Sequence, residues 1–347
     1  MNDILLSQYK PRSELRVDQH EVMKPKYPVF DVHTHMGSLL LGGNYESKYD
    51  TGEFVKTLEY YGIKTSVNLD GVWGSGLDRM LNKTKGYEDR ILTFGWIDTS
   101  DIDNPVFAKN TEKVLKEGYE RGIRGIKLWK NLSLGQKDSK GKYIPVDDRR
   151  LDPIWDTCAE LNIPVLIHIA DPIAFFKVID EHNERYEQLC LNPDWSFCRP
   201  EFFKYEELME MQEKMLYNNP HTTFIIAHFG SSSEDLRFVA RCLDSYPNMY
   251  VDTAARISEL GRQPYTSRDF FIKYQDRILF GSDHCPTAIP VYDIYYRFFE
   301  TRDEYFDHDK DDGRDLNGKW KIYGIYLPDE VLGKIYNRNA EKIILKK

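Results

Sequence analysis

The chain has 347 residues, of which 41% are hydrophobic, so it is long enough to bury a large core. Its net charge of −9 is spread along the sequence rather than gathered in blocks, which argues against nucleic acid as a partner. No run approaches the ~18 apolar residues of a membrane span, and the N-terminus lacks the apolar core of a signal peptide. Five cysteines without a C-x-x-C pair are typical of a reduced protein, so we expect a cytoplasmic location and no membrane partner.

Short apolar, β-branched runs recur along the whole chain and predict strands. Eight of them stand out, at residues 27–35, 65–71, 90–97, 123–129, 163–169, 222–230, 249–254 and 277–284. Helical patterns lie between them, at residues 52–62, 111–122, 152–162, 205–220, 233–247 and 267–275, and residues 327–347 predict a closing helix. Strands that alternate with helices indicate parallel βαβ units, and eight such units predict a closed (β/α)8 TIM barrel.

Two of the helix starts carry capping signals. Asp152 is predicted to cap the helix at 152–162, with Pro153 at its first helical position. Ser231 and Glu234 fit the S-x-x-E capping box ahead of the helix at 233–247. We therefore favour helix capping over an anion site for the serine-rich residues 230–236.

The predicted elements fit a single domain over residues 1–347. It divides into an N-terminal extension (1–26), a barrel core (27–300) and a C-terminal extension (301–347). An insertion after the fifth strand and before its helix, about 170–204, opens on the face where barrels carry their active sites, so it is a candidate lid or pocket wall. A second long stretch, about 301–327 with the acidic run HDKDDGRD, is expected to pack outside the barrel.

Polar side chains gather at the carboxyl ends of the candidate strands. His33 and His35 lie two apart on the first strand and therefore share a face. His168 ends the fifth strand, His228 the sixth and Asp283 the eighth, and a barrel brings these ends together at one mouth. Imidazole and carboxylate groups are the ligands that Zn²⁺ and similar ions take. For a lone histidine a hydrogen-bonded core role would be the better interpretation, but the joint pattern favours a metal site.

This pattern resembles that of the amidohydrolase superfamily, with H-x-H on the first strand, a lysine on the fourth and an aspartate on the eighth. The sequences FDVHTH and ILFGSDHCP resemble the first and last strand motifs of one branch in particular. That branch includes aminocarboxymuconate-semialdehyde decarboxylase and related hydrolases, and the resemblance covers about residues 27–300. It implies a TIM barrel with a metal site, whereas the substrate stays open because one scaffold hosts several reactions.

The resemblance also implies roles for individual residues. His33, His35, His168 and Asp283 would bind one divalent ion, for which Zn²⁺ is expected. His228 would polarise the substrate or handle a proton. The ion would lower the pKa of a bound water toward ~7, and Asp283 could accept the proton of that water and return it to a leaving group.

Lys127, in the sequence GIKLWK, allows three interpretations. In two-metal relatives the equivalent lysine is carboxylated and bridges two ions, and His168 and His228 would then hold the second ion. An unmodified Lys127 would instead bind a carboxylate or oxyanion of the substrate. A structural lysine paired to a neighbour is the third possibility.

Further residues are candidates for contact with the substrate. Arg256, just after the seventh strand, could meet an anionic substrate or form a loop salt bridge. Trp129 is in phase with Lys127 and could wall an apolar pocket. Asp171 could touch substrate or cap a turn, and Asp31, one layer below the ligands, could orient a histidine or be a buried structural carboxylate.

Three functions therefore stay open. The first is a metal-dependent hydrolase that uses a metal-activated water to cleave an ester, lactone or amide in a small molecule. The alternative is a metal-dependent, non-oxidative decarboxylase of an aromatic or unsaturated carboxylic acid, and a non-catalytic barrel is the third. In each enzyme the partner is a small molecule, and assembly into a homo-oligomer, the identity of the metal and the number of ions stay open.

Overall fold

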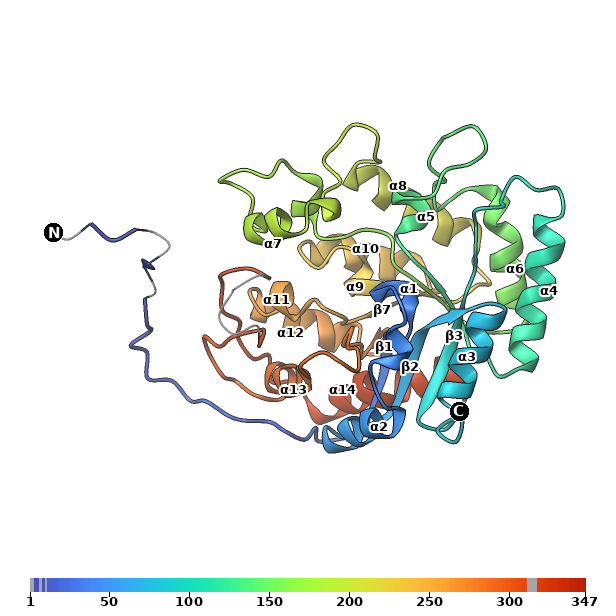
Figure 1. Cartoon of the computed structure of the whole chain (residues 1–347). Coiled ribbons are helices and arrows are strands. Elements are labelled where there is room, and N and C mark those ends of the chain that lie inside the picture. The colour runs from blue at the N-terminus through green and yellow to red at the C-terminus, as the bar shows by residue number, and fades with distance from the viewer. Residues whose placement is uncertain (1–2, 6–7, 10, 311–316) are drawn as a thin grey trace.

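The computed structural model describes residues 3–5, 8–9, 11–310 and 317–347 (Figure 1). Within these residues, eight parallel strands pair in the order in which they occur along the chain. They are β1 (Val29–Thr34), β2 (Ile63–Val72), β3 (Ile91–Trp96), β4 (Ile126–Leu128), β5 (Val165–Ile167), β6 (Phe224–Ile226), β7 (Met249–Asp252) and β8 (Ile278–Leu279). Each lies within or overlaps a predicted strand, so the predicted (β/α)8 TIM barrel is confirmed.

Backbone hydrogen bonds between β1 and the residues at the end of β8 close the barrel. Val32 N donates to Phe280 O and Asp283 N donates to His33 O, each at 2.9 Å. His35 N continues the ladder by donating to His284 O, also at 2.9 Å. The closure therefore places Asp283 in register between the two histidines of the H-x-H motif.

Helices cover the outside of the barrel (Figure 1). The longer ones are α2 (Thr51–Tyr60), α3 (Ser75–Lys83), α4 (Phe107–Glu120), α6 (Asp152–Glu160), α8 (Tyr205–Asn218), α10 (Leu236–Ser245), α12 (Pro264–Lys273) and α13 (Tyr292–Glu300). Short helices follow several strands or lie in loops: α1 (Ser38–Leu41), α5 (Asn131–Leu134), α7 (Tyr186–Leu191), α9 (Ala227–Gly230) and α11 (Ile257–Leu260). Six of the longer helices match predicted ranges, whereas α3 and α13 lie outside them.

The two capping predictions fail in detail. Helix α6 begins at Asp152 itself, with Leu151 in the N-cap position. Helix α10 is capped by Asp235, whose side chain accepts from two backbone amides of the first turn. Ser231 Oγ instead accepts from a backbone amide after β5, and Glu234 Oε1 accepts from Ile173 N at 3.0 Å. The two residues of the expected capping box, Ser231 and Glu234, therefore connect the end of β6 to the insertion after β5.

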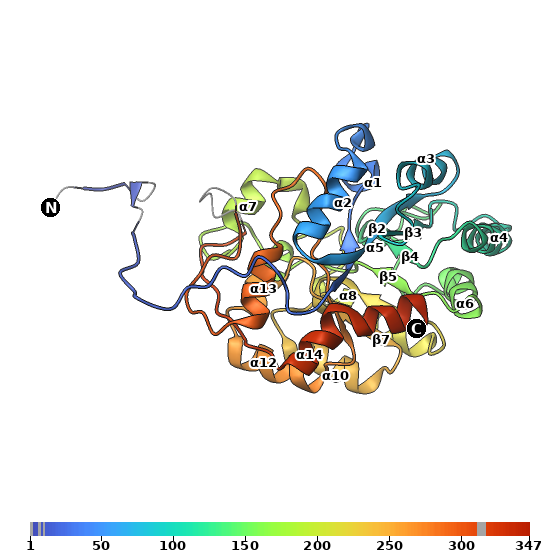
Figure 2. The ribbon, with the colours of Figure 1, turned by 90° about the horizontal axis from the view of Figure 1, so that it is seen from below.

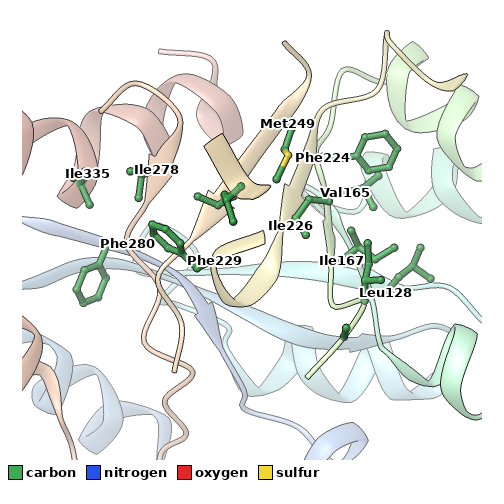
Figure 3. Close-up of a cluster of buried hydrophobic side chains, with 14 of the residues drawn as sticks. Leu128, Val165, Ile167, Phe224, Ile226, Phe229, Met249, Ile278, Phe280 and Ile335 are labelled. Atoms are coloured by element: carbon green, nitrogen blue, oxygen red, sulfur yellow. The ribbon is translucent and has the colours of Figure 1, made fainter. Parts of the chain in front are cut away.

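Side chains of the strands alternate between two apolar clusters. Leu166 and Ile225 point into the barrel interior, whereas Val165, Ile167 and Ile226 pack outward against the helices. Figure 3 shows part of this outer layer. This alternation is the two-residue period of a strand, and continuous apolar runs result because both faces are buried.

The C-terminal residues form a helical segment that packs against the interior cluster. It consists of α14 (Asp329–Gly333) and the turns Lys334–Arg338 and Glu341–Leu345, and it lies on the near side of the molecule in Figure 2. Ala340, Ile343 and Ile344 join the side chains inside the barrel. The predicted closing helix is thus confirmed, and it supplies core residues.

The end of the N-terminal extension is fastened to this C-terminal part. The His20 ring and backbone contact the Asp303 carboxylate at 2.5 and 2.7 Å. Lys26 N donates to Glu300 at 3.1 Å and its Nζ to Asp329 at 2.8 Å. The described residues ahead of this anchor extend away from the barrel (Figures 1 and 2). The predicted division of the chain at residues 26 and 300 stays a prediction.

Phe280 offers a test of the packing behind the site. Its side chain, labelled in Figure 3, is fully buried. Its ring lies 5.4 Å from that of Tyr295 and 5.7 Å from that of Tyr336. We expect Phe280→Ala to lower the free energy of unfolding by about 3–5 kcal/mol, because it removes buried surface and leaves a cavity. Equilibrium denaturation in urea measures this difference.

The matched control is Tyr265→Ala, since Tyr265 is 87% exposed. Its effect should stay within about 0.5 kcal/mol. A loss below about 1 kcal/mol for Phe280→Ala would contradict the described packing.

Candidate metal centre and active site

Two histidines and one carboxylate converge at the mouth of the barrel. His33 Nε2 and His35 Nε2 lie 3.4 and 3.3 Å from Asp283 Oδ1. One ligand atom from each of the three residues lies within 4.8 Å of those of the other two. The barrel closure thus brings together three of the four predicted metal ligands.

Each histidine of this cluster has a carboxylate behind it. His33 Nδ1 donates to Asp252 Oδ2 at 2.8 Å, and His35 Nδ1 donates to Asp70 Oδ2 at 3.0 Å. The Nε2 atoms of both rings therefore face Asp283, and each offers a lone pair to an ion when it carries no proton. A histidine that gives one nitrogen to a carboxylate and the other to an ion is the usual arrangement in metal sites, so the donor set fits a divalent ion.

The charges around the cluster also favour a cation. Although burial lowers it, the carboxylates of Asp70 and Asp283 raise the pKa of His35 to about 9. Burial would raise the pKa of Asp283, yet the neighbouring histidines, His33 foremost, hold it well below its usual range. Asp283 is therefore a carboxylate at neutral pH, which is the form that binds a metal.

His168 and His228 form a second layer beside the cluster. Their ring centroids lie 4.2 Å apart, and His228 lies 5.0 Å from His33. His168 does not belong to the tight group of three, so its role as fourth ligand stays a prediction. Burial lowers the pKa of His168 to about 4 and that of His228 well below 6.5, so both are neutral at pH 7.

Backbone geometry fixes the position of His228. Its φ of 55° begins a left-handed run, and its backbone N donates to Asp252 Oδ1 at 2.8 Å. The ring Nδ1 donates to Ala254 O at 3.0 Å, which leaves Nε2 as an acceptor toward the pocket. Asp283 also has a positive φ, 66°. Left-handed backbone at residues other than glycine is strained and gathers at functional sites, which supports these two residues as active.

Lys127 on β4 is completely buried at the same mouth. Its Nζ has no hydrogen-bond partner in the described part of the chain, and it lies 5.2 Å from the ring centroid of Trp129. Burial lowers the pKa of this amine from 10.5 to about 8. These contacts do not support the interpretation of Lys127 as a structural lysine paired to a neighbour. A carboxylated lysine that bridges two ions and an unmodified lysine that binds the substrate both stay open.

These residues line a cavity of about 640 Å³. Its apolar side includes Leu41, Trp129, Phe175 and Trp195, and two of these come from the insertion after β5. The insertion is therefore a pocket wall, as predicted. A cavity of this size, with an apolar wall beside many polar and charged groups, suits a small molecule that carries both an apolar or planar part and a polar one.

The prediction for residues 301–327 was wrong. His308, Asp309 and Asn317 line the cavity, so described residues of this stretch lie at the mouth of the barrel instead of packing outside it. Gln188 Nε2 of the insertion donates to Asn317 Oδ1 at 2.8 Å, and this contact holds the two segments together. Most of the acidic run HDKDDGRD, residues 311–315, lies outside the described residues.

The candidate substrate residues differ in what they contact. Arg256 lines the cavity and donates from Nη1 to Ala255 O at 2.8 Å, and no carboxylate of the described chain pairs with it. Asp171 also lines the cavity, but it is paired with Lys130 and lies 3.2 Å from His168 Nε2. That approach lacks hydrogen-bond geometry. Asp171 therefore resembles a support for His168 more than a contact for the substrate.

Asp31 does not orient a histidine ring. Its carboxylate accepts from Ser282 N, Tyr292 OH and His33 N, each at 3.1 Å. The support of the ring falls instead to Asp70 and Asp252, which the sequence analysis missed. Both stand at the carboxyl ends of strands, which is the signal that could have found them.

A barrel with a histidine and aspartate cluster at its mouth defines a class of enzymes that work with a bound metal. The family model described as amidohydrolase matches residues 48–344, and the chain belongs to this family. No curated protein matches the sequence. The resemblance predicted from the strand motifs is thereby confirmed, whereas zinc as the ion stays a prediction.

Solved structures with the same fold include several decarboxylases. The chain is similar to a 2,6-dihydroxybenzoate decarboxylase in complex with 2,6-dihydroxybenzoate, at 15% identity and a TM-score of 0.57, over 92% of this chain and 100% of that one. A dihydroxybenzoic acid decarboxylase from Polaromonas sp. JS666, with manganese and 2-nitroresorcinol, shares 14% identity over 92% and 98% of the chains, with a TM-score of 0.58.

A third structure is 5-carboxyvanillate decarboxylase from Novosphingobium aromaticivorans DSM 12444, with manganese and 4-hydroxy-3-methoxy-5-nitrobenzoic acid. It shares 12% identity over 94% of this chain and 100% of that one, with a TM-score of 0.54. At these identities the likeness concerns the fold. No helix in the described residues is long and apolar enough to cross a membrane.

Proposed function

We propose that this protein is a metal-dependent, non-oxidative decarboxylase of a small aromatic or unsaturated carboxylic acid. One observation carries the proposal: two cationic side chains without a carboxylate partner, Lys127 and Arg256, share the cavity with the His33, His35 and Asp283 cluster. Buried charges are normally paired, so two unpaired ones in a single cavity indicate that an anion completes the site.

His33, His35 and Asp283 would hold the metal, with His168 beside them. A bound divalent ion would supply positive charge that stabilises the negative charge developing on the substrate. Manganese in two similar decarboxylases supports a divalent ion as the cofactor. Elemental analysis of the purified protein would distinguish manganese from zinc.

The side chains around the cluster would position and protonate the substrate. Arg256 would bind an anionic group, and Trp129 and Phe175 would pack against a planar ring. As the bond to the carboxylate breaks and CO2 leaves, the carbon must gain a proton. With a hydroxylated benzoic acid, Asp283, which its low pKa keeps ionised in the free site, would take the proton from the hydroxyl group of the substrate and pass it to that carbon, so that CO2 and a phenolate are the products. His228 would accept a hydrogen bond at Nε2 and orient the substrate.

Release of CO2 tests this function directly. We expect the protein, loaded with Mn²⁺ or Zn²⁺, to release CO2 from at least one member of a panel of hydroxylated benzoic acids. The similar structures guide the choice of this panel. His33→Ala should release none at the same concentration, because the variant lacks a predicted metal ligand.

Two results would reject the proposed decarboxylase. Products of hydrolysis without CO2, from a parallel panel of esters, lactones and amides, would reject decarboxylation in favour of hydrolysis. Equal behaviour of the wild type and His33→Ala on both panels would favour a non-catalytic barrel.

Hydrolysis is the second candidate, and one observation favours it. Lys127 is buried, lacks a partner among the described residues and has a pKa lowered to about 8, so a fraction of it is a neutral amine near pH 7. A neutral amine can add CO2 to form a carbamate, and this carbamate could bridge two ions with His168 and His228. Two metal equivalents per chain would support this alternative, and one equivalent would support the decarboxylase.

A further inference from the structure

An ion pair at the wall of the cavity, which Arg185 lines, joins the insertion after β5 to the short helix that follows β7. Arg185 precedes α7 and Glu259 lies in α11, and the two helices are neighbours in Figure 1. Arg185 is 4% exposed and Glu259 is 1% exposed. Arg185 Nη2 donates to Glu259 Oε1, and Ser258 Oγ donates to Glu259 Oε2 at 2.7 Å. Both oxygens of this carboxylate are therefore engaged.

Arg256 is nearer to Glu259 in the sequence than Arg185 is, yet it does not form an ion pair with Glu259. The two residues are three apart at the start of α11, which is a spacing at which side chains on a helix normally meet. Among the described residues the guanidinium of Arg256 instead donates a hydrogen bond only to Ala255 O, and Arg256 lines the cavity with Asp283. Its freedom to meet a ligand therefore depends on what else binds Glu259.

The protein binds both terminal nitrogens of the Arg185 guanidinium, whereas Nε has no hydrogen-bond partner among the described residues and the side chain also lines the cavity. Besides Glu259, it donates from Nη1 to Asn317 O and stacks on Trp320, with 4.8 Å between its guanidinium carbon and the ring centroid. A buried carboxylate such as Glu259 keeps its charge only beside a cation. Without Arg185 the other cations near Glu259 are Arg256 and Arg262, and Arg262 is already paired with Glu184.

We infer that Arg185 determines substrate specificity indirectly. Because Arg185 binds Glu259, Arg256 is left free to bind the anionic group of the substrate. Arg185 is thus a positioning residue that makes the pocket selective for anions. This inference rests on the proposed function, in which Arg256 receives the substrate anion. It predicts that the selectivity is lost with Arg185 and restored when Glu259 is neutralised.

Binding of benzoate, with benzamide as its neutral counterpart, provides the test. With metal-loaded protein in a calorimeter, Arg185→Met should weaken benzoate binding about 10- to 100-fold, because a charge-assisted hydrogen bond from Arg256 is lost. Benzamide binding should change less than about threefold. The double variant Arg185→Met/Glu259→Gln should bind benzoate as the wild type does, since nothing then competes for Arg256.

Arg262→Met is the matched control. Arg262 stacks on the same Trp320 ring, at 3.8 Å, but pairs with Glu184 rather than Glu259. This variant should therefore bind benzoate normally. If Arg185→Met does not fold, the comparison of the double variant with Glu259→Gln alone replaces it, and both are expected to bind benzoate with wild-type affinity.

The outcomes separate the inference from the function on which it rests. Benzoate binding that stays weak in the double variant would mean that Arg185 contacts the anion itself, and wild-type binding in Arg185→Met would mean that Glu259 does not compete. Either result overturns the inference. If Arg256→Met leaves benzoate binding unchanged, the assignment of Arg256 in the proposed function fails, whatever Arg185 does.

Discussion

Asp283→Asn is expected to abolish turnover and to release most of the bound metal. Asparagine keeps the shape of the side chain but removes the charge that faces His33 Nε2 and His35 Nε2 at 3.4 and 3.3 Å. It also cannot carry a proton to the substrate. We expect a loss of about 10³-fold or more in the rate of CO2 release. Elemental analysis of protein purified without chelators should show the fall in metal content at the same time.

Asp31→Asn is the control for the loss of a buried carboxylate near this site. Burial raises the pKa of Asp31 to about 7, so a good part of it is already uncharged at neutral pH. Asparagine imitates that form, and the metal content should stay close to that of the wild type. An Asp283→Asn protein that keeps its metal and more than about a tenth of its rate would remove Asp283 from both of its proposed roles.

Lys127→Met is expected to have the second largest effect. In the proposed decarboxylase the ammonium of Lys127 stabilises negative charge in a buried site, and loss of such a group costs about 10²–10³-fold in rate. The pH dependence should follow the same group. Because burial lowers the pKa of Lys127 to about 8, the cation is present below that pH, and the activity should fall as the pH rises through it. This decline should be absent from the residual activity of Lys127→Met.

Lys130→Met is the control that distinguishes the loss of the Lys127 ammonium from the loss of another lysine in the cavity. Lys130 lines the same cavity but is paired with Asp171, so its removal should cost much less than the loss of Lys127. Metal content supplies the decisive count: one equivalent is expected in the wild type and in Lys127→Met. Two equivalents in the wild type and one in the variant would show that Lys127 carries a bridging carbamate, and the hydrolase would then be the better function.

The sequence was sufficient for the barrel and for much of its mouth. Eight apolar runs with helices between them leave few arrangements other than a closed parallel barrel. Once the strands are placed, His33, His35, His228 and Asp283 must lie at one end, because parallel strands finish on the same side. No knowledge of side-chain contacts was needed for that step.

Contacts between side chains that lie far apart in the sequence could not be predicted from the sequence. Asp252 supports the His33 ring across 219 residues. Its position at the carboxyl end of β7 indicates a residue of the mouth, but it does not indicate which histidine Asp252 binds. The sequence around His308 and Asn317 has no strand or helix periodicity, so the position of these two residues at the mouth could not be predicted. Its position depends on single contacts, such as that from Gln188, rather than on a repeated pattern.

The closure of the barrel between β1 and the end of β8 has a consequence for metal exchange. Main-chain bonds set the spacing of His33, Asp283 and His35, so the three donors are held in place before any ion arrives. The apoprotein should therefore be a folded, reloadable protein rather than one that needs metal to fold. A preorganised site of this kind exchanges its ion without unfolding, and the ion it carries in a cell then follows the local supply as well as intrinsic affinity.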